Sequence, residues 1–216
     1  MKNVFLKLNG ILLMMVLLCG CGGAVSEKAL EQKYGEHFTV TEAKRYGEGY
    51  LAWAVPDSNP NIVVKATLNG DGSQVGDDYG VKSVCYEVTK MAEEYTDEYV
   101  FTSNAMGSVR VEKGITPEQF LMDDPNDEFH IKVFAEEGTD LRTLYDSAVK
   151  IRGIVSRCSV DVYLLEKDDL LMVKKNLAKY AEVGSDTVKE AVSRGHKCII
   201  DTVPTFEEFE RSLSGE

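Results

Sequence analysis

The stretch Phe129–Leu165, FHIKVFAEEGTDLRTLYDSAVKIRGIVSRCSVDVYLL, changes its hydrophobic periodicity twice. It opens and closes with short apolar runs, Phe129–Ala135 and Val160–Leu165, which have the length and composition of β-strands. Between them, apolar residues recur at helical spacing over about residues 140–157. Strand, helix and strand in this order predict a β-α-β unit, whose two strands are parallel.

The same alternation continues to the end of the chain. Cys198–Val203 is a further strand-like run, and Thr205 with Glu208 forms the capping-box pattern that starts a final helix. Residues 128–216 are therefore expected to form a β-α-β-α-β-α subdomain, in which Val160–Leu165 and Cys198–Val203 run parallel. Besides the helix at 140–157, helices are expected over residues 168–182, 186–194 and 206–213.

Upstream of this region, the pattern is that of an antiparallel meander. Its strand-like runs, His37–Arg45, Tyr50–Val55 and Asn61–Leu68, are joined by short connections rich in turn residues. A short helix over residues 26–34 precedes them. An apolar stripe from Val81 to Tyr95 follows, and it predicts a helix that packs across the meander.

The chain is thus expected to have a mixed α+β (α/β) fold. An N-terminal α-β-β-β-α meander layer precedes the β-α-β-α-β-α segment, which contains some parallel strands. Residues 26–127 form the first subdomain and a bridge, and residues 128–216 form the second. One continuous domain over residues 26–216 is the alternative, since the length suits either arrangement.

The N-terminus has the three parts of an export signal. Lys2 and Lys7 form a positive region, and Ile11–Leu18 is an apolar run that is too short to span a bilayer. Leu18, Gly20 and Cys21 follow in the pattern Leu-x-Gly-Cys. This segment resembles the lipobox of bacterial lipoproteins, and the resemblance covers the signal segment alone.

The resemblance implies a lipid anchor at Cys21. Residues 1–20 would be the lipoprotein signal peptide, and the mature chain would lie at the extracytoplasmic face of the cell membrane. Two acyl chains are sufficient for stable membrane attachment. Residues 21–25 would form a lipidated tether, which spans about 14 Å when extended.

The charge of the chain limits its partners. Removal of Lys2 and Lys7 changes the formal net charge from −12 to −14. Nucleic acid is excluded as a partner, because binding it requires a basic stripe. The domain should face an anionic membrane with its least acidic side.

Three cysteines remain after Cys21. Cys85 lies on the apolar stripe of its predicted helix and is interpreted as a buried thiol. Cys158 and Cys198 each begin a predicted strand, so parallel neighbouring strands would bring both thiols to the same end of the sheet. The expected compartment permits a disulfide between them. Two free, buried thiols are the alternative.

An acidic rim is expected where the carboxyl ends of parallel strands meet. Its members would be Glu136, Asp140, Glu166, Asp169 and Asp201. Hard oxygen ligands of this kind can hold a divalent cation. The favoured interpretation is that these acids cap helix N-termini and complement the helix dipoles, so no metal site is predicted.

No catalytic motif is present in the sequence, and neither an enzyme activity nor a cofactor is predicted. The expected function is that of a membrane-anchored, acidic module that binds a protein or another envelope component. A cation-binding or small-ligand-binding lipoprotein that uses the acidic rim is the alternative.

Overall fold

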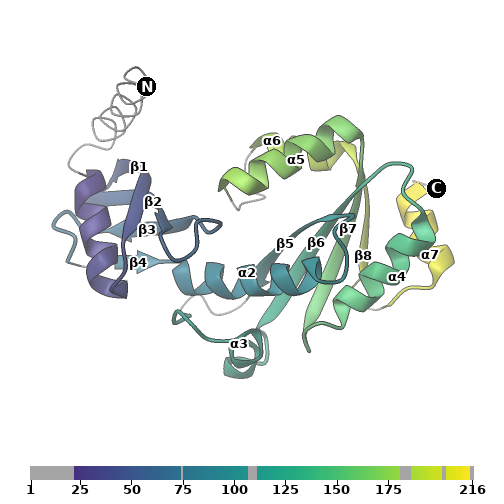
Figure 1. Ribbon diagram of the computed structural model, residues 1–216, viewed down its shortest axis with the longest axis horizontal. Helices are drawn as coiled ribbons and strands as arrows, with labels where there is room; N and C mark the ends of the chain where they lie inside the picture. Colours follow the sequence, from purple (N-terminus) through teal and green to yellow (C-terminus); the bar gives the residue numbers. More distant parts are fainter. Residues whose placement is uncertain (1–21, 74, 107–110, 181–185, 201–202, 215–216) are drawn as a thin grey trace, which may run out of the picture. The chain divides into compact units, whose positions relative to one another are not determined.

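The computed structural model describes residues 22–216, except residues 74, 107–110, 181–185, 201–202 and 215–216 (Figure 1). The chain divides into two compact units, Met1–Tyr79 and Gly80–Glu216. The fold class predicted from the sequence is confirmed: one helix and an antiparallel sheet come first, and a mixed sheet with helices follows. The division differs from the predicted boundary between residues 127 and 128.

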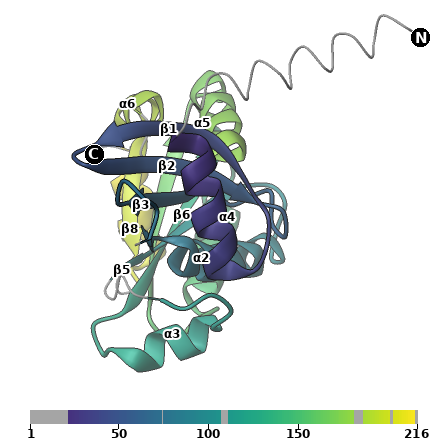
Figure 2. The same ribbon diagram turned by 90° about the vertical axis from the view of Figure 1, so that its left-hand side faces the viewer.

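The first unit is the predicted antiparallel meander with one additional strand. A helix over residues 22–34 lies across one face of the sheet (Figure 2). The strands pair in the order β1-β2-β3-β4, and every pair is antiparallel. Their bounds are Phe38–Tyr46 (β1), Gly49–Pro56 (β2), Val64–Leu68 (β3) and Val75–Asp77 (β4). The strand β4 was not predicted, because a run of only 3 residues carries almost no periodic signal.

Strand alternation builds the core of the first unit. In β3, Val64, Ala66 and Leu68 are buried while the residues between them are exposed. The ring of Tyr79 closes this core, lying edge-on to Tyr34 at 5.0 Å and to Phe38 at 5.5 Å between ring centroids.

The tether predicted for residues 21–25 is wrong for residues 22–25, which already belong to the first helix. The Ser26 hydroxyl donates a hydrogen bond to the Gly22 carbonyl oxygen at 2.7 Å, which links the start of the first helical turn to the residue one turn later. Four helical residues advance about 6 Å, less than half the length of an extended tether. Cys21 lies outside the described residues.

The second unit is built on a sheet with the order β5-β6-β7-β8. The strands β6 and β7 are parallel, as predicted, while β5 and β8 pair antiparallel to their neighbours. The strands are Val100–Met106 (β5), Glu128–Glu136 (β6), Cys158–Leu165 (β7) and His196–Ile200 (β8). The helices are Tyr79–Glu93 (α2), Pro117–Asp123 (α3), Leu141–Arg152 (α4), Lys167–Tyr180 (α5), Asp186–Arg194 (α6) and Phe206–Ser214 (α7).

The prediction that β8 is parallel to β7 is wrong. Two helices, α5 and α6, lie between these strands, and the first turn of α5 is paired with the last turn of α6 through Asp169 and Arg194. A single crossover helix carries the chain back along the sheet, whereas a helical pair returns it to the end that it left. The next strand must then run in the opposite direction.

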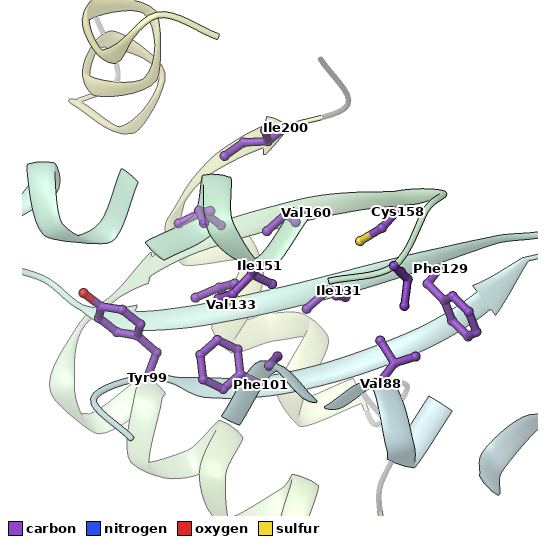
Figure 3. Packing of buried hydrophobic residues seen from close by; sticks show 14 of the residues in the cluster. Val88, Tyr99, Phe101, Phe129, Ile131, Val133, Ile151, Cys158, Val160 and Ile200 are labelled. Atoms are coloured by element: carbon purple, nitrogen blue, oxygen red, sulfur yellow. The ribbon is translucent and has the colours of Figure 1, made fainter. Parts of the chain in front are cut away.

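The helix α2 does not pack across the meander as predicted. Its stripe of Val84, Cys85, Val88 and Ala92 belongs to the core of the second unit. That core lies on one face of the second sheet, where α4 and α7 also pack; Figure 3 shows Val88 and Ile151 close to Phe101 and other strand residues. The strand β5, which lies within the residues 26–127 predicted as the first subdomain and bridge, supplies Phe101 to this core.

No helix within the described residues is long and apolar enough to span a membrane.

Candidate functional site

The two faces of the second sheet are covered differently. One face carries the main core of the unit, on which the helices α2, α4 and α7 pack. On the other face, α5 and α6 pack over Phe134, Tyr163 and Leu165, at one end of the central strands. Beyond that end the side chains are mostly polar, and we call this region the open face. Its members are Thr102, Asn104, His130, Lys132, Ser159, Asp161, Lys197 and Ile199.

Strand register brings these residues together. In the parallel pair, His130 lies opposite Ser159 and Lys132 opposite Asp161. Each of these residues alternates with an apolar residue that points into the main core, as Lys132 does between Ile131 and Val133. The edges of the open face are accessible to solvent: Asn104 is exposed, and Ile199 is 52% exposed.

A chain of hydrogen bonds crosses the two central strands. The Ser159 hydroxyl lies 2.9 Å from Nδ1 of His130, and Nε2 of the same ring lies 2.7 Å from a Glu128 carboxylate oxygen. In the neutral ring protonated on Nε2, Ser159 donates to Nδ1 and the ring donates to Glu128. This order is that of a proton relay, but Ser159 is only 5% exposed. The chain of bonds therefore serves mainly to hold the His130 ring in one orientation.

The second polar group of the open face is centred on Asp161. Its carboxylate lies 2.9 Å from Nζ of Lys197 and accepts a hydrogen bond from the Tyr163 hydroxyl at 3.2 Å. Burial opposes the charged form of Lys197, but the hydrogen bonds with Asp161 and Tyr163 outweigh it and raise the pKa of the ammonium. The negative charge of Asp161 is therefore balanced by Lys197 within the protein.

Lys132 is placed differently. Burial lowers the pKa of its ammonium, and the nearby Lys197 acts in the same direction, while Asp161 acts against them. Within the described residues, no carboxylate is in ion-pair contact with Lys132. A partly desolvated ammonium of this kind gains from an anionic group brought by a partner, because the attraction is strongest where water is scarce.

The predicted acidic rim forms only in part. Glu136 and Glu166 lie at the carboxyl ends of the parallel strands β6 and β7, as expected, because Glu136 is paired with Leu165. Asp140 is the N-cap of α4 and accepts a hydrogen bond from the Thr143 backbone N–H at 2.8 Å. Hydrogen bonding to the Thr143 side chain and backbone lowers the pKa of the Asp140 carboxyl. This is the helix-capping role that the sequence favoured.

Asp169 is not available to a cation at the rim. Asp169 forms a two-pronged pair with the Arg194 guanidinium, whose hydrogen bonds lower the pKa of the Asp169 carboxyl. Asp201 lies outside the described residues. In the sequence it follows β8, which runs antiparallel to β7. The carboxyl end of β8 therefore lies at the opposite end of the strands from the carboxyl end of β7.

The cysteines are buried thiols. Cys85, Cys158 and Cys198 are free in the structure. Cys198 is paired with Val162, four residues along β7 from Cys158, which corresponds to about 13 Å along the strand. A disulfide requires Cα atoms about 5.5 Å apart, so this register does not allow the bridge that parallel strands would have allowed.

One charged cluster was missed by the sequence analysis. In the first unit, Glu27 and Glu31 lie one helical turn apart, and Gly35, with φ of +68°, turns the chain so that His37 returns beside them. Hydrogen bonding to Glu31 raises the pKa of His37. The two carboxylates lie beside different nitrogens of the same ring, Glu31 at Nδ1 and Glu27 at Nε2. A protonated ring between two carboxylates accounts for this geometry more directly than ligands around a common ion.

Comparison with known proteins shows the fold alone. No family model matches the sequence, and no curated protein matches it. The crystal structure of a DUF5037 family protein from Ruminococcus gnavus ATCC 29149 is similar to this chain, with a TM-score of 0.64 at 14% sequence identity. The similarity covers 90% of this chain and 99% of that one. The name of that protein assigns no function to it.

Proposed function

We propose that this chain is a lipid-anchored protein of the extracytoplasmic membrane face and binds a protein or envelope partner through the open face. The observation that carries the binding role is a set of polar side chains on one face of a sheet whose other face carries the main core, with Asn104 and Lys197 exposed on its outer strands. The lipobox pattern at Cys21 supports the anchoring.

The open face offers a partner a defined pattern of charge. Asp161 is already paired with Lys197, and Glu128 is hydrogen-bonded to the His130 ring. Lys132 is the cation of the open face that has no ion pair within the described residues, so it is the group that we expect a partner to bind. The partner is therefore expected to bring a carboxylate or phosphate.

The anchoring is tested by Cys21→Ala in the native host. The variant should fail to incorporate a fatty-acid analogue and should stay unprocessed, since the other nearby thiol, Cys19, follows the bulky Leu18 instead of a small residue. Labelled Cys21→Ala protein would contradict the anchor.

The binding surface is tested by photo-crosslinking in the native membrane. A crosslinking residue is placed at Asn104, on the open face, or at Met122, a matched control on α3 that is 81% exposed. Position 104 should yield a discrete product that Lys132→Met abolishes, because this substitution keeps the stem of the side chain and removes its charge. Equal products from both positions, or a product that Lys132→Met leaves unchanged, would reject the open face.

A further inference from the structure

In the first unit, no flexible linker separates the folded part from the proposed lipid attachment at Cys21. Residue 22 follows Cys21 directly, so their Cα atoms are about 3.8 Å apart. The start of the helix is also fixed against the sheet: a Cβ at Gly22 would lie 2.6 Å from the Tyr50 ring. Lipid on Cys21 would therefore hold a rigid part of the protein at the bilayer rather than a flexible tail.

The β1–β2 and β3–β4 connections lie at the same end of the meander as the start of the helix. Tyr50, which contacts Gly22, directly follows the hairpin between β1 and β2, where Tyr46 is paired with Gly49. The connection between β3 and β4 approaches the helix as well, since a Cβ at Gly72 would lie 2.9 Å from the Val25 side chain. We call this region of the first unit the anchor end.

The composition of the anchor end suits a lipid headgroup layer. Tyr46 is 62% exposed at the tip of the hairpin. Beside it, the Arg45 guanidinium lies over the Tyr50 ring at 5.3 Å from the centroid and donates a hydrogen bond to the Tyr50 hydroxyl. Exposed tyrosine next to arginine is typical of membrane interfaces, where the ring lies among the headgroups and the cation reaches the phosphates.

The charge of the anchor end is balanced, unlike that of the whole chain. The positive charges of Lys44 and Arg45 are offset by the negative charges of the exposed Glu48 and Asp71. The mature chain as a whole has a formal net charge of −14. Anionic lipids repel acidic surfaces, so this end can approach them at lower electrostatic cost than the protein as a whole.

We propose that the anchor end lies directly on the bilayer, with Tyr46 at the level of the lipid headgroups. This inference rests on the lipid attachment at Cys21 proposed above. The acyl chains and the anchor end then act as two linked contacts, and the first unit keeps one orientation towards the membrane.

The test measures the depth of a single tryptophan placed at either of two positions in the first unit. The sole native tryptophan is first removed by Trp53→Phe, and Tyr46→Trp or Gln32→Trp is then introduced. Gln32 is an exposed residue in the last turn of the first helix, ten residues from Gly22 and thus about 15 Å farther along the axis. The proteins are expressed from the full-length chain and purified from membranes. They are reconstituted into phosphatidylcholine vesicles that contain phosphatidylglycerol and a lipid spin-labelled at its headgroup.

Upon reconstitution into the spin-labelled vesicles, tryptophan emission from the Tyr46→Trp variant should be strongly quenched and shifted to shorter wavelength. Emission from the Gln32→Trp variant should be the same with and without these vesicles. Equal quenching in both variants, or quenching in neither, in protein that cosediments with the vesicles would overturn the docked orientation and leave the anchor intact. Protein that carries no fatty acid and does not cosediment would instead show that the anchor itself is wrong.

Discussion

The reactivity of the three thiols tests two features of the second unit: the burial of its cysteines and the antiparallel direction of β8. In a chain that starts at Gly22, the cysteines are Cys85, Cys158 and Cys198, and all are buried and free. Burial raises the pKa of the Cys158 thiol from 9.0 to about 12 and raises that of Cys198 as well. Because the thiolate is the nucleophile, this rise in pKa lowers the reactive fraction of Cys158 at pH 8 by about a thousandfold. Burial also keeps reagents away from the sulfur.

The assay is alkylation at pH 8 followed by mass spectrometry of the intact protein. The native chain should remain unmodified over a period in which a small-molecule thiol reacts completely. In denaturant without reductant, the same chain should gain three adducts. A single adduct in denaturant would reveal a disulfide, and a bridge between Cys158 and Cys198 in particular would refute the antiparallel register of β8. Rapid alkylation of the native chain would refute the burial of the thiols.

The same pKa shift predicts how stability depends on pH. The folded-state pKa of Cys158 lies above the unfolded value, so the unfolded chain releases the thiol proton first as the pH rises. The stabilisation is complete below about pH 9 and is lost between about pH 9 and pH 12, at roughly 1.4 kcal/mol per pH unit. Cys158→Ala should show a smaller alkaline loss in urea unfolding; an unchanged slope would contradict the shift. Two further predictions concern the helices of the second unit. Phe209→Ala should lower the free energy of unfolding by about 3–5 kcal/mol, because Phe209 is fully buried where α7 meets the core; urea unfolding measures this, and a loss below about 1 kcal/mol would contradict the packing. Millimolar calcium should leave the melting temperature unchanged, because Asp140 caps a helix and Asp169 is paired with Arg194. A rise in melting temperature that Glu166→Gln removes would restore the acidic rim as a cation site.

Local patterns in the sequence predicted most elements of the fold. The predicted capping box at Thr205 is formed: the Glu208 side chain accepts a hydrogen bond from the Thr205 backbone N–H, and the Thr205 hydroxyl accepts one from the Glu208 backbone N–H. The parallel pairing of β6 and β7 followed from a single helix between them. These features depend on residues close in sequence, or on one short connection, so periodicity and capping chemistry are sufficient to find them.

The candidate site could be predicted only in part. The alternation of polar His130 and Lys132 with apolar neighbours was visible in one strand, and that of Ser159 and Asp161 in the next. Their adjacency could be expected from the β-α-β unit, but the sequence did not show which face the helices would cover. Lys197 could not be added, because its place beside Asp161 depends on the antiparallel direction of β8.

The sequence by itself determined the types of most elements, the acidic charge of the chain, and the Leu-x-Gly-Cys pattern on which the proposed anchor rests. The tertiary structure decided which sheet the helix α2 would cover, the direction of β8, and the start of the first helix immediately after Cys21. The physical reason is the range of the interactions. A helical stripe shows that a helix buries one face, but the surface that accepts it lies far away in sequence. The direction of a strand likewise depends on how the whole intervening connection packs.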